Sequence, residues 1–388
     1  MATTVALTNP VALTNPTVQA APQASAPGTP VLTVDTELVR QRYLVLCGAL
    51  PGVQLHYAVK ANPAPAVLTT LLELGSQWDV ASPGEIDAVL EIGGEPRQMS
   101  YGNTIKKAAD ISYAAAQGLR RFTVDSAPEL AKIIALAPHA TVLVRLATSG
   151  AGADLALGSK SGCPERKPGT CSRWRTTPAI RSAWPSMSGA NSRPHAWDPP
   201  LAAAARLRAG LRATGGDLAV IDIGGGFPAT TLDATRFDDR YGATIMASLA
   251  RHLGAHPPEV MAEPGRALVA DAGVLQTEVV LVAERDGVRW VYLDVGLFGG
   301  LAEAHGESIR YRLEVSRDGS PLTGEVGETV LAGPTCDSFD VLFRKNRYRL
   351  PLDLRPGDRL RFQSAGAYTT TYSSVGFNGF APLREVYR

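Results

Sequence analysis

Short apolar stretches and amphipathic stretches alternate along the first two thirds of the chain. Stretches that alternate or run apolar predict strands; they are VQLHYAVKAN, QWDVAS, QMSYGN, RFTVDS, TVLVRLA, DLAVIDIGGG and EVMAEPGRALVA. Stretches with helical spacing follow the first four, namely PAPAVLTTLLELG, PGEIDAVLEIG, KKAADISYAAAQG and APELAKIIALAP. Strand, loop and helix in this rhythm are typical of parallel βα units. Six or more such units in series favour a closed (β/α)8 barrel of the TIM type.

Before the first unit, PVLTVD at 30–35 predicts a short strand, and TELVRQRYLVLCGAL predicts a helix capped by Thr36. After about residue 270 the pattern becomes rich in strands separated by turn sequences such as RDG and PGD. The fold class predicted is therefore α/β, a (β/α)8 barrel plus a C-terminal, mostly antiparallel β domain. We expect four parts, a disordered tail at 1–28, a strand at 29–37 that joins the β domain, the barrel at 38–270 and the β domain at 271–388.

Composition narrows the class of protein. The formal net charge is +1, which gives no support to nucleic-acid or polybasic membrane binding. The four cysteines show no CxxC spacing, so free thiols in a reducing compartment are expected. The tail repeats VALTNP and lacks the basic and apolar regions of a signal peptide, and no apolar run approaches the roughly 20 residues of a membrane helix. We expect a cytoplasmic protein without a metal site.

The chemistry is expected at the C-terminal ends of the barrel strands, where barrel enzymes place their active sites. Those positions hold Lys60, Asp79, Asn103, Asp125, Arg145, Gly224, Gly225, Gly226, Glu263, Gly265 and Arg266. A desolvated lysine has a lowered pKa and can form a Schiff base with an aldehyde. Consecutive glycines and an arginine suit a phosphate, and a carboxylate can keep a pyridine nitrogen protonated. Together these groups predict a pyridoxal 5'-phosphate (PLP) site.

Seven ordered motifs make the match specific, namely HYAVKANP, WDVASPGEID, SYGNTIKK, DIGGGFP, EPGRALV, GPTCDSFDVL and GAYTTTYSSVGFNGF. With them the chain resembles the fold-type III PLP-dependent decarboxylases, the ornithine/lysine decarboxylase group most of all. The resemblance covers about residues 30–388 apart from one gap. It implies a PLP-dependent amino-acid decarboxylase, a carboxy-lyase, with a small-molecule amino-acid substrate.

The resemblance also implies a role for each matching residue. Lys60 would hold the cofactor covalently, and Glu263 would pair with its pyridine nitrogen. The phosphate would be held by Gly226, Gly265, Arg266 and Tyr368, with Gly224 and Gly225 in the same loop. Asp79 and Arg145 would lie near the cofactor.

A homodimer with shared active sites is implied as well. Cys336 and Asp337 of GPTCD would reach into the partner subunit's site, where Cys336 would protonate the carbanion and Asp337 would bind the distal amine. Related eukaryotic enzymes have a further acid in an Asn-Asp-Gly motif. This chain has Asp294 one residue earlier, in Asp294-Val295-Gly296, so Asp294 is a second candidate for substrate binding.

Cys-Asp in the GPTCD motif favours ornithine or lysine as substrate, with a diamine product that suits polyamine biosynthesis. Ornithine and lysine differ by one methylene, worth about 1–3 kcal/mol in a pocket, so the choice between them stays open. Three alternatives remain: a diaminopimelate decarboxylase, which usually shows Cys-Glu here, an amino-acid racemase of the same fold, and a catalytically impaired homologue of the decarboxylases.

Residues 164–192 depart from the family. Relatives have a helix and a strand resembling G-x-x-F-H-V-G-S, whose His stacks on the PLP ring and whose Ser contacts the phosphate. This chain instead has arginines, prolines and two tryptophans, as in AIRSAWPSMSGANS. Codons for 179–192 read in a shifted phase permit HPVGLAFHVGSQQ, so one hypothesis is a pair of compensating frame slips, near Pro164 and Ser192, in the gene or in its sequencing. The alternative is a genuine insertion loop. His195 is expected to begin the next helical region rather than to stack on the ring.

Overall fold

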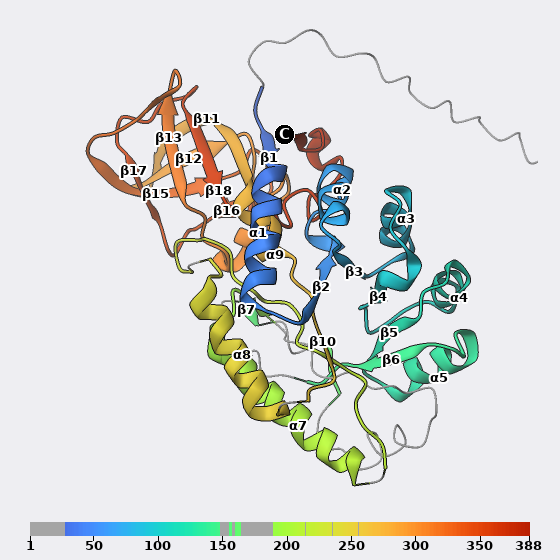
Figure 1. Cartoon of the computed structure of the whole chain (residues 1–388). Helices are drawn as coiled ribbons and strands as arrows, with labels where there is room; N and C mark the ends of the chain where they lie inside the picture. The colour runs from blue at the N-terminus through green and yellow to red at the C-terminus, as the bar shows by residue number, and fades with distance from the viewer. Residues whose placement is uncertain are drawn as a thin grey trace, which may run out of the picture.

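The computed structural model describes residues 28–147, 155–156, 160–163, 189–213, 215–234, 236–254 and 256–388. Within these ranges a curled sheet of parallel strands forms one layer of the molecule (Figure 1). Its strands are β2 (Val53–Ala58), β3 (Gln77–Val80), β4 (Met99–Tyr101), β5 (Arg121–Val124), β6 (Thr141–Val144), β9 (Val220–Asp222) and β10 (Glu259–Ala262). They are hydrogen-bonded in the order β6-β5-β4-β3-β2-β10-β9. The parallel βα pattern predicted from the sequence is therefore confirmed.

Helices cover the outer face of this sheet (Figure 1). They are α1 (Thr36–Ala49), α2 (Pro65–Glu73), α3 (Pro83–Glu91), α4 (Ala108–Gln117), α5 (Ala127–Leu136), α7 (Asp198–Arg212), α8 (Asp239–Leu253) and α9 (Arg266–Val269). Short 3₁₀ turns are η1 (Val59–Ala61), η2 (Pro96–Gln98), η3 (Pro194–Trp197), η4 (Ala270–Ala272), η5 (Ala302–Glu307) and η6 (Phe377–Gly379). His195 thus lies in the turn that leads into α7, as predicted.

The cap predicted for α1 is wrong by one residue. Asp35 is the N-cap, and its Oδ1 accepts from the backbone N–H groups of Glu37 and Leu38 at 3.0 and 3.3 Å. A carboxylate satisfies two otherwise unpaired N–H groups at once, so it is the better cap. The Thr36 hydroxyl instead donates to the carbonyl of Arg388 at 3.0 Å, which ties the start of α1 to the C-terminal residue.

The described residues account for seven strands of the expected barrel, with β6 and β9 at the two edges. Beyond the end of β6, Leu146 forms an isolated parallel β-bridge with Cys163. A small antiparallel pair, β7 (Leu155–Ala156) with β8 (Gly189–Ala190), follows. Of the departing segment 164–192, residues 164–188 lie outside the described residues, and they include most of the place where the remaining strand is expected.

The second layer is a ten-stranded, mostly antiparallel sheet, as predicted for the C-terminal part of the chain. Its strands are β1 (Val31–Val34), β11 (Gly273–Arg285), β12 (Val288–Leu293), β13 (Leu313–Arg317), β14 (Ser320–Pro321), β15 (Val326–Ala332), β16 (Val341–Leu342), β17 (Tyr348–Pro351), β18 (Arg359–Gln363) and β19 (Arg384–Tyr387). The N-terminal strand β1 lies between β11 and β19, antiparallel to the first and parallel to the second. The C-terminus is therefore beside β1 (Figure 1), and the predicted tail, apart from Gly28, lies outside the described residues.

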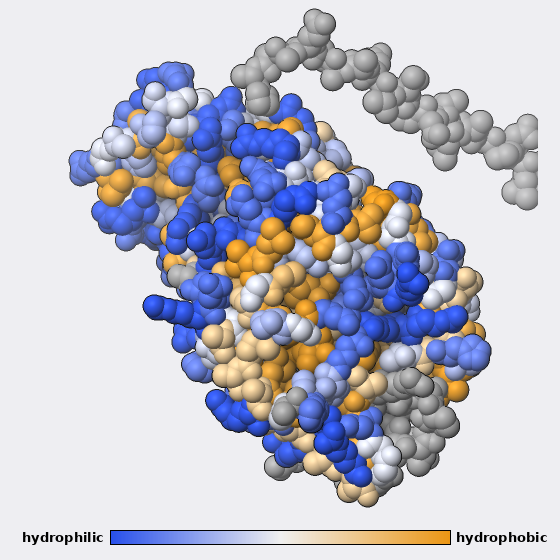
Figure 2. Space-filling view, in the orientation of Figure 1, coloured by the Kyte–Doolittle hydropathy of each residue, from blue (hydrophilic) through white to orange (hydrophobic). Residues whose placement is uncertain are grey.

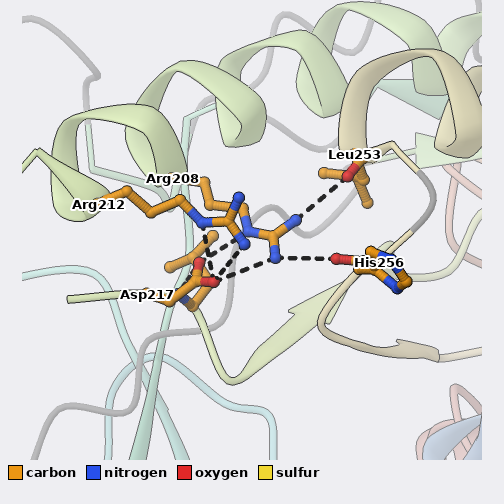
Figure 3. Close-up of polar contacts among 6 residues, drawn as sticks. Arg208, Arg212, Asp217, Leu253 and His256 are labelled. Carbon is orange, nitrogen blue, oxygen red and sulfur yellow. Dashed lines mark hydrogen bonds and ion pairs between the residues drawn. The ribbon is translucent and has the colours of Figure 1, made fainter. Parts of the chain in front are cut away.

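An ion cluster holds α7 against the barrel (Figure 3). The buried Arg208 donates to both carboxylate oxygens of Asp217, at 2.7 and 3.1 Å, and to the carbonyls of Leu253 and His256. Arg212, one turn later, also pairs with Asp217 at 2.7 Å. The cluster joins α7, the approach to β9 and the end of α8, so it fixes the strand that leads to the glycine loop.

The surface seen in Figure 2 is largely hydrophilic over the β domain and has a hydrophobic area near the middle of the molecule. Exposed large apolar side chains include Leu44 on α1 and Phe339 and Val375 in C-terminal loops. Among the described residues, none of the helices has the length and apolar character needed to cross a membrane. In the same part of the chain, no cluster of His, Cys, Asp or Glu is arranged to hold a metal ion.

Candidate active site

Lys60 and Asp79 form the centre of the site. The register of β2 against β3 places Ala58 opposite Asp79, so the turn η1 carries Lys60 over the end of β3. Lys60 Nζ lies 3.3 Å from Asp79 Oδ2. The Asp79 side chain is 2% exposed and the Lys60 side chain 51% exposed. The amine therefore faces an open space while its counter-ion forms the wall behind it.

The predicted lowering of the Lys60 pKa is wrong for this structure. Asp79 raises the pKa of Lys60 above its ordinary value, and the opposing effect of burial is smaller. The prediction considered desolvation alone, whereas an opposite charge within hydrogen-bond distance favours the charged amine more strongly. Asp79 therefore holds Lys60 as an ammonium group and fixes its position.

A pair of carboxyl groups lies across the neighbouring strands β9 and β10. Burial, and then the charge of Asp222, raise the pKa of Glu263 well above its usual range. Burial likewise raises the pKa of Asp222 to about 6. Asp222 is buried and Glu263 half-buried, and two carboxyl groups in contact cannot both ionise easily, so the contact favours a proton shared between them. The charge of Arg145, at the end of β6, opposes this rise in the pKa of Asp222.

The glycine loop after β9 is shaped by close backbone approach. Gly224 and Gly226 have φ of +70° and +87°, a region that side chains disfavour. A Cβ on Gly225 would lie 2.8 Å from the Glu263 carbonyl oxygen. The Gly224 N–H donates to Asp222 Oδ1 at 2.7 Å. The part of this loop that is suited to an anion is therefore the backbone of Gly225 and Gly226.

Arg266 and Tyr368 lie together at the start of α9. Arg266 is buried, pairs with Glu303, and has its guanidinium carbon 5.1 Å from the centre of the Tyr368 ring. The Tyr368 N–H donates to the Ala61 carbonyl at 2.8 Å, next to Lys60. A Cβ on Gly265 would come within 3.2 Å of the Tyr368 hydroxyl oxygen, so glycine is what lets these two loops meet.

Cys336 and Asp337 lie elsewhere in the chain, in the exposed loop after β15. Cys336 Sγ is 3.5 Å from Asn378 Oδ1, and Asp337 Oδ1 accepts from the N–H of Phe339 at 2.8 Å. Asp294 Oδ1 accepts from the Thr277 hydroxyl and, at 2.9 Å, from the Glu278 N–H. Asp294 also lines a cavity of about 380 Å³ in the β domain, together with Thr335.

Four residues near the site escaped the sequence reasoning. Asp222 directly precedes the glycine loop in DIGGG, and its position at the end of a predicted strand is the signal for it. Glu85, the last residue of the S-x-x-E sequence at the start of α3, accepts from the Ala81 N–H at 2.7 Å, and burial raises its pKa to about 7. Ser192 is buried, and its N–H donates to the Gly226 carbonyl at 2.8 Å. Glu303 has no sequence signal, because its partner Arg266 is distant in the chain.

The described residues fit PLP. Asp79 Oδ1 and Arg266 Nε are both buried, and neither has a hydrogen-bond partner within the described part of the chain. An amine, a proton-sharing carboxyl pair and an arginine beside a glycine loop match an aldehyde, a ring nitrogen and a phosphate, respectively. A barrel edge with these three groups is the arrangement of a PLP-dependent enzyme.

Comparison with known proteins agrees with this class. The family model described as "Pyridoxal-dependent decarboxylase, pyridoxal binding domain" matches residues 36–183 and 189–270. The lysine/ornithine decarboxylase of Selenomonas ruminantium is 32% identical over 361 residues, which cover 91% of this chain and 88% of that protein. The ornithine decarboxylase of Schizosaccharomyces pombe is 30% identical, covering 96% of this chain and 87% of that protein.

Solved structures are similar over nearly the whole chain. The lysine/ornithine decarboxylase from Vibrio vulnificus, complexed with cadaverine, has a TM-score of 0.81 and 32% identity, covering 93% of this chain and 95% of that one. This chain belongs to the fold-type III PLP-dependent decarboxylases of the ornithine/lysine group. It is a carboxy-lyase that uses PLP to decarboxylate a basic amino acid.

Proposed function

We propose that the substrate is ornithine or lysine and that the product is the corresponding diamine, used in polyamine synthesis. The observation that carries the proposal is the half-exposed Lys60 amine held 3.3 Å from the buried Asp79. One relative supports the choice of substrates, since the lysine/ornithine decarboxylase from Vibrio vulnificus is described in two complexes, with cadaverine and with putrescine. We place this activity in the cytoplasm, on the basis of free thiols such as Cys47.

Different residues of one protomer bind different parts of the cofactor. When bound, PLP supplies a ring that delocalises the electron pair left by the departing carboxylate. Lys60 would hold the cofactor covalently through its amine, which Asp79 keeps in position. Glu263, whose carboxyl group shares a proton with Asp222, would pair with the ring nitrogen.

The phosphate of the cofactor is assigned to a group of residues suited to binding an anion. Its members are the glycine loop Gly224, Gly225 and Gly226, with Gly265, Arg266 and Tyr368. Arg145 completes the wall on the β6 side of the sheet. Backbone N–H groups and a buried guanidinium are strong donors to phosphate oxygens.

The other two residues act across a homodimer. In one protomer Cys336 is exposed and Asp337 half-buried, and the neighbouring Phe339 is 70% exposed. An apolar side chain this open beside reactive groups suits a surface that a second copy covers. There Cys336 returns a proton to the substrate carbon, and Asp337 binds the distal ammonium group. Asp294 remains the second candidate for that ammonium group.

We also propose the domain organisation given by the sequence. The tail is 1–28, the strand 29–37 joins the β domain, the barrel is 38–270 and the β domain is 271–388. The pairing of β1 with β11 and β19 supports the second of these assignments.

Borohydride reduction of the purified protein with PLP, followed by peptide mapping, tests the assignment of Lys60. We expect the label on Lys60 and its loss in Lys60→Ala, while release of CO₂ from ornithine and lysine identifies the substrate. Label on Lys106 or Lys160 instead would refute the assignment, and release from neither amino acid would refute the substrate proposal.

A further inference from the structure

Arg266 and Glu303 form a buried ion pair between the two parts of the molecule. Arg266 begins α9, directly after the last barrel strand, whereas Glu303 lies in η5, which follows β12 of the β domain. Their side chains are 7% and 6% exposed. A buried ion pair is a weak source of stability, because two charges must leave water to form it. We therefore look for a role of this ion pair other than holding the two domains together.

The Arg266 guanidinium is constrained on one end and one face. Nη2 is bound to Glu303 Oε1, and the Tyr368 ring lies against the group with 5.1 Å between its centre and Cζ. Arg266 Nε is buried and makes no hydrogen bond to any described residue. A guanidinium is a rigid planar fork, so fixing one end and one face fixes the direction of every other N–H.

We propose that Glu303 is a positioning residue, which orients Arg266 so that its remaining N–H groups meet the phosphate of PLP. The proposal rests on the phosphate-binding role proposed above for Arg266. Because η5 belongs to the β domain, Glu303 makes the affinity for the cofactor depend on how that domain sits against the barrel.

Charge and position predict opposite results. A carboxylate close to a phosphate repels it, so if charge alone mattered, Glu303→Gln would bind PLP more tightly and Glu303→Asp would match wild type. If position matters, the ranking reverses. Glutamine keeps an acceptor oxygen at the same place, whereas aspartate keeps the charge and withdraws the acceptor by one methylene.

The experiment titrates cofactor-free protein with PLP and, separately, with pyridoxal, which lacks the phosphate, following absorbance. For Glu303→Asp we expect the Kd for PLP to rise about tenfold, in the range known for residues that orient a ligand's direct partners. For Glu303→Gln we expect a rise of less than about threefold. Neither variant should change the Kd for pyridoxal. Glu307→Gln is the matched control, since Glu307 lies on the same turn and binds the backbone of Lys345 and Asn346.

A double-mutant cycle separates this inference from the role of Arg266. Arg266→Ala should weaken PLP binding, and Glu303→Asp should add nothing in that background. If Arg266→Ala leaves the Kd for PLP unchanged, the phosphate role itself is wrong. If Arg266→Ala weakens PLP binding but Glu303→Asp does not, the positioning role of Glu303 is overturned. It is also overturned if Glu303→Asp weakens the binding of pyridoxal as much as that of PLP. Tighter PLP binding by Glu303→Gln would also overturn it.

Discussion

Gly102 tests whether the Lys60–Asp79 contact is as rigid as the structure indicates. Gly102 follows β4 directly, and its N–H donates to the Val80 carbonyl at 2.9 Å. A Cβ added there would lie 2.0 Å from Asp79 Oδ1 and 3.0 Å from its Cγ. Gly102→Ala therefore places a methyl group directly against the counter-ion of Lys60 without changing any charge.

The magnitude follows from the distances. Ordinary contact begins near 3.4 Å, so Oδ1 would have to retreat by about 1.4 Å. The Asp79 side chain is 2% exposed, and packed surroundings yield little, so strain of about 1–3 kcal/mol is expected in the folded state. The displaced carboxylate would no longer face Lys60 at 3.3 Å, and the pKa of Lys60 would fall towards its ordinary value.

Two measurements check this prediction. Denaturant unfolding of the cofactor-free protein should give a free energy of unfolding lower by the stated amount. The rate at which Lys60 reacts with an amine reagent, followed against pH by peptide mapping, should show a lower pKa. Gly84→Ala is the control, because a Cβ there meets nothing closer than Ser82 Oγ at 3.9 Å. An unfolding free energy within about 0.5 kcal/mol of wild type, with an unchanged Lys60 pKa, would refute the reasoning.

Four further predictions concern other parts of the chain. Cys336→Ala should lower turnover strongly and spare PLP absorbance, and loss of that absorbance would argue against a role after cofactor binding. Asp337→Ala should raise KM for ornithine and lysine, at a cost of roughly 2–5 kcal/mol, but not for norleucine; equal effects would contradict it. Arg208 lowers the pKa of Asp217 below its ordinary 3.8, so the stability that Asp217 adds is complete above that pH and is lost on acidification. The free energy of unfolding that Asp217→Asn loses relative to wild type, measured in urea, should therefore shrink from pH 7 to 3.5. A loss that stays constant with pH would disprove this prediction. Protein with 164–192 restored to the shifted reading should bind PLP more tightly and release CO₂ faster than the chain with its present sequence, whereas equal decarboxylase activity would show that the segment is a tolerated loop.

The chemistry at the strand ends could be predicted because it depends on local pattern alone. Parallel strands present their C-terminal ends at one edge, so Lys60, Asp79 and Glu263 had to share that edge once their strands were identified. The direction of the Lys60 pKa could not be predicted in the same way. It depends on the register that sets Ala58 opposite Asp79, and register follows from packing across strands rather than from either strand alone.

Glu303 shows a second limit of sequence reasoning. It lies 37 positions after Arg266, in a turn without periodicity, and the two meet only because the β domain packs on the barrel. Asp222 is different, since its place before the glycine loop was visible in the sequence. What the sequence left open was the contact between Asp222 and Glu263 on the adjacent strand, which makes Asp222 one member of a proton-sharing pair.

The position of β1 between β11 and β19 has a consequence for biosynthesis. The ribosome synthesises β1 before any other strand of the sheet. Its two neighbours, β11 and β19, are synthesised much later, and β19 ends at Tyr387. The loop that closes on Ala61 and Asn62, through the backbone of Tyr368 and Gly366, is also a late product. Domains fold as their residues emerge, so the barrel strands can begin to pair while β1 still waits. A nascent chain stalled before residue 366 would thus present Lys60 without the backbone contacts that hold the neighbouring residues Ala61 and Asn62.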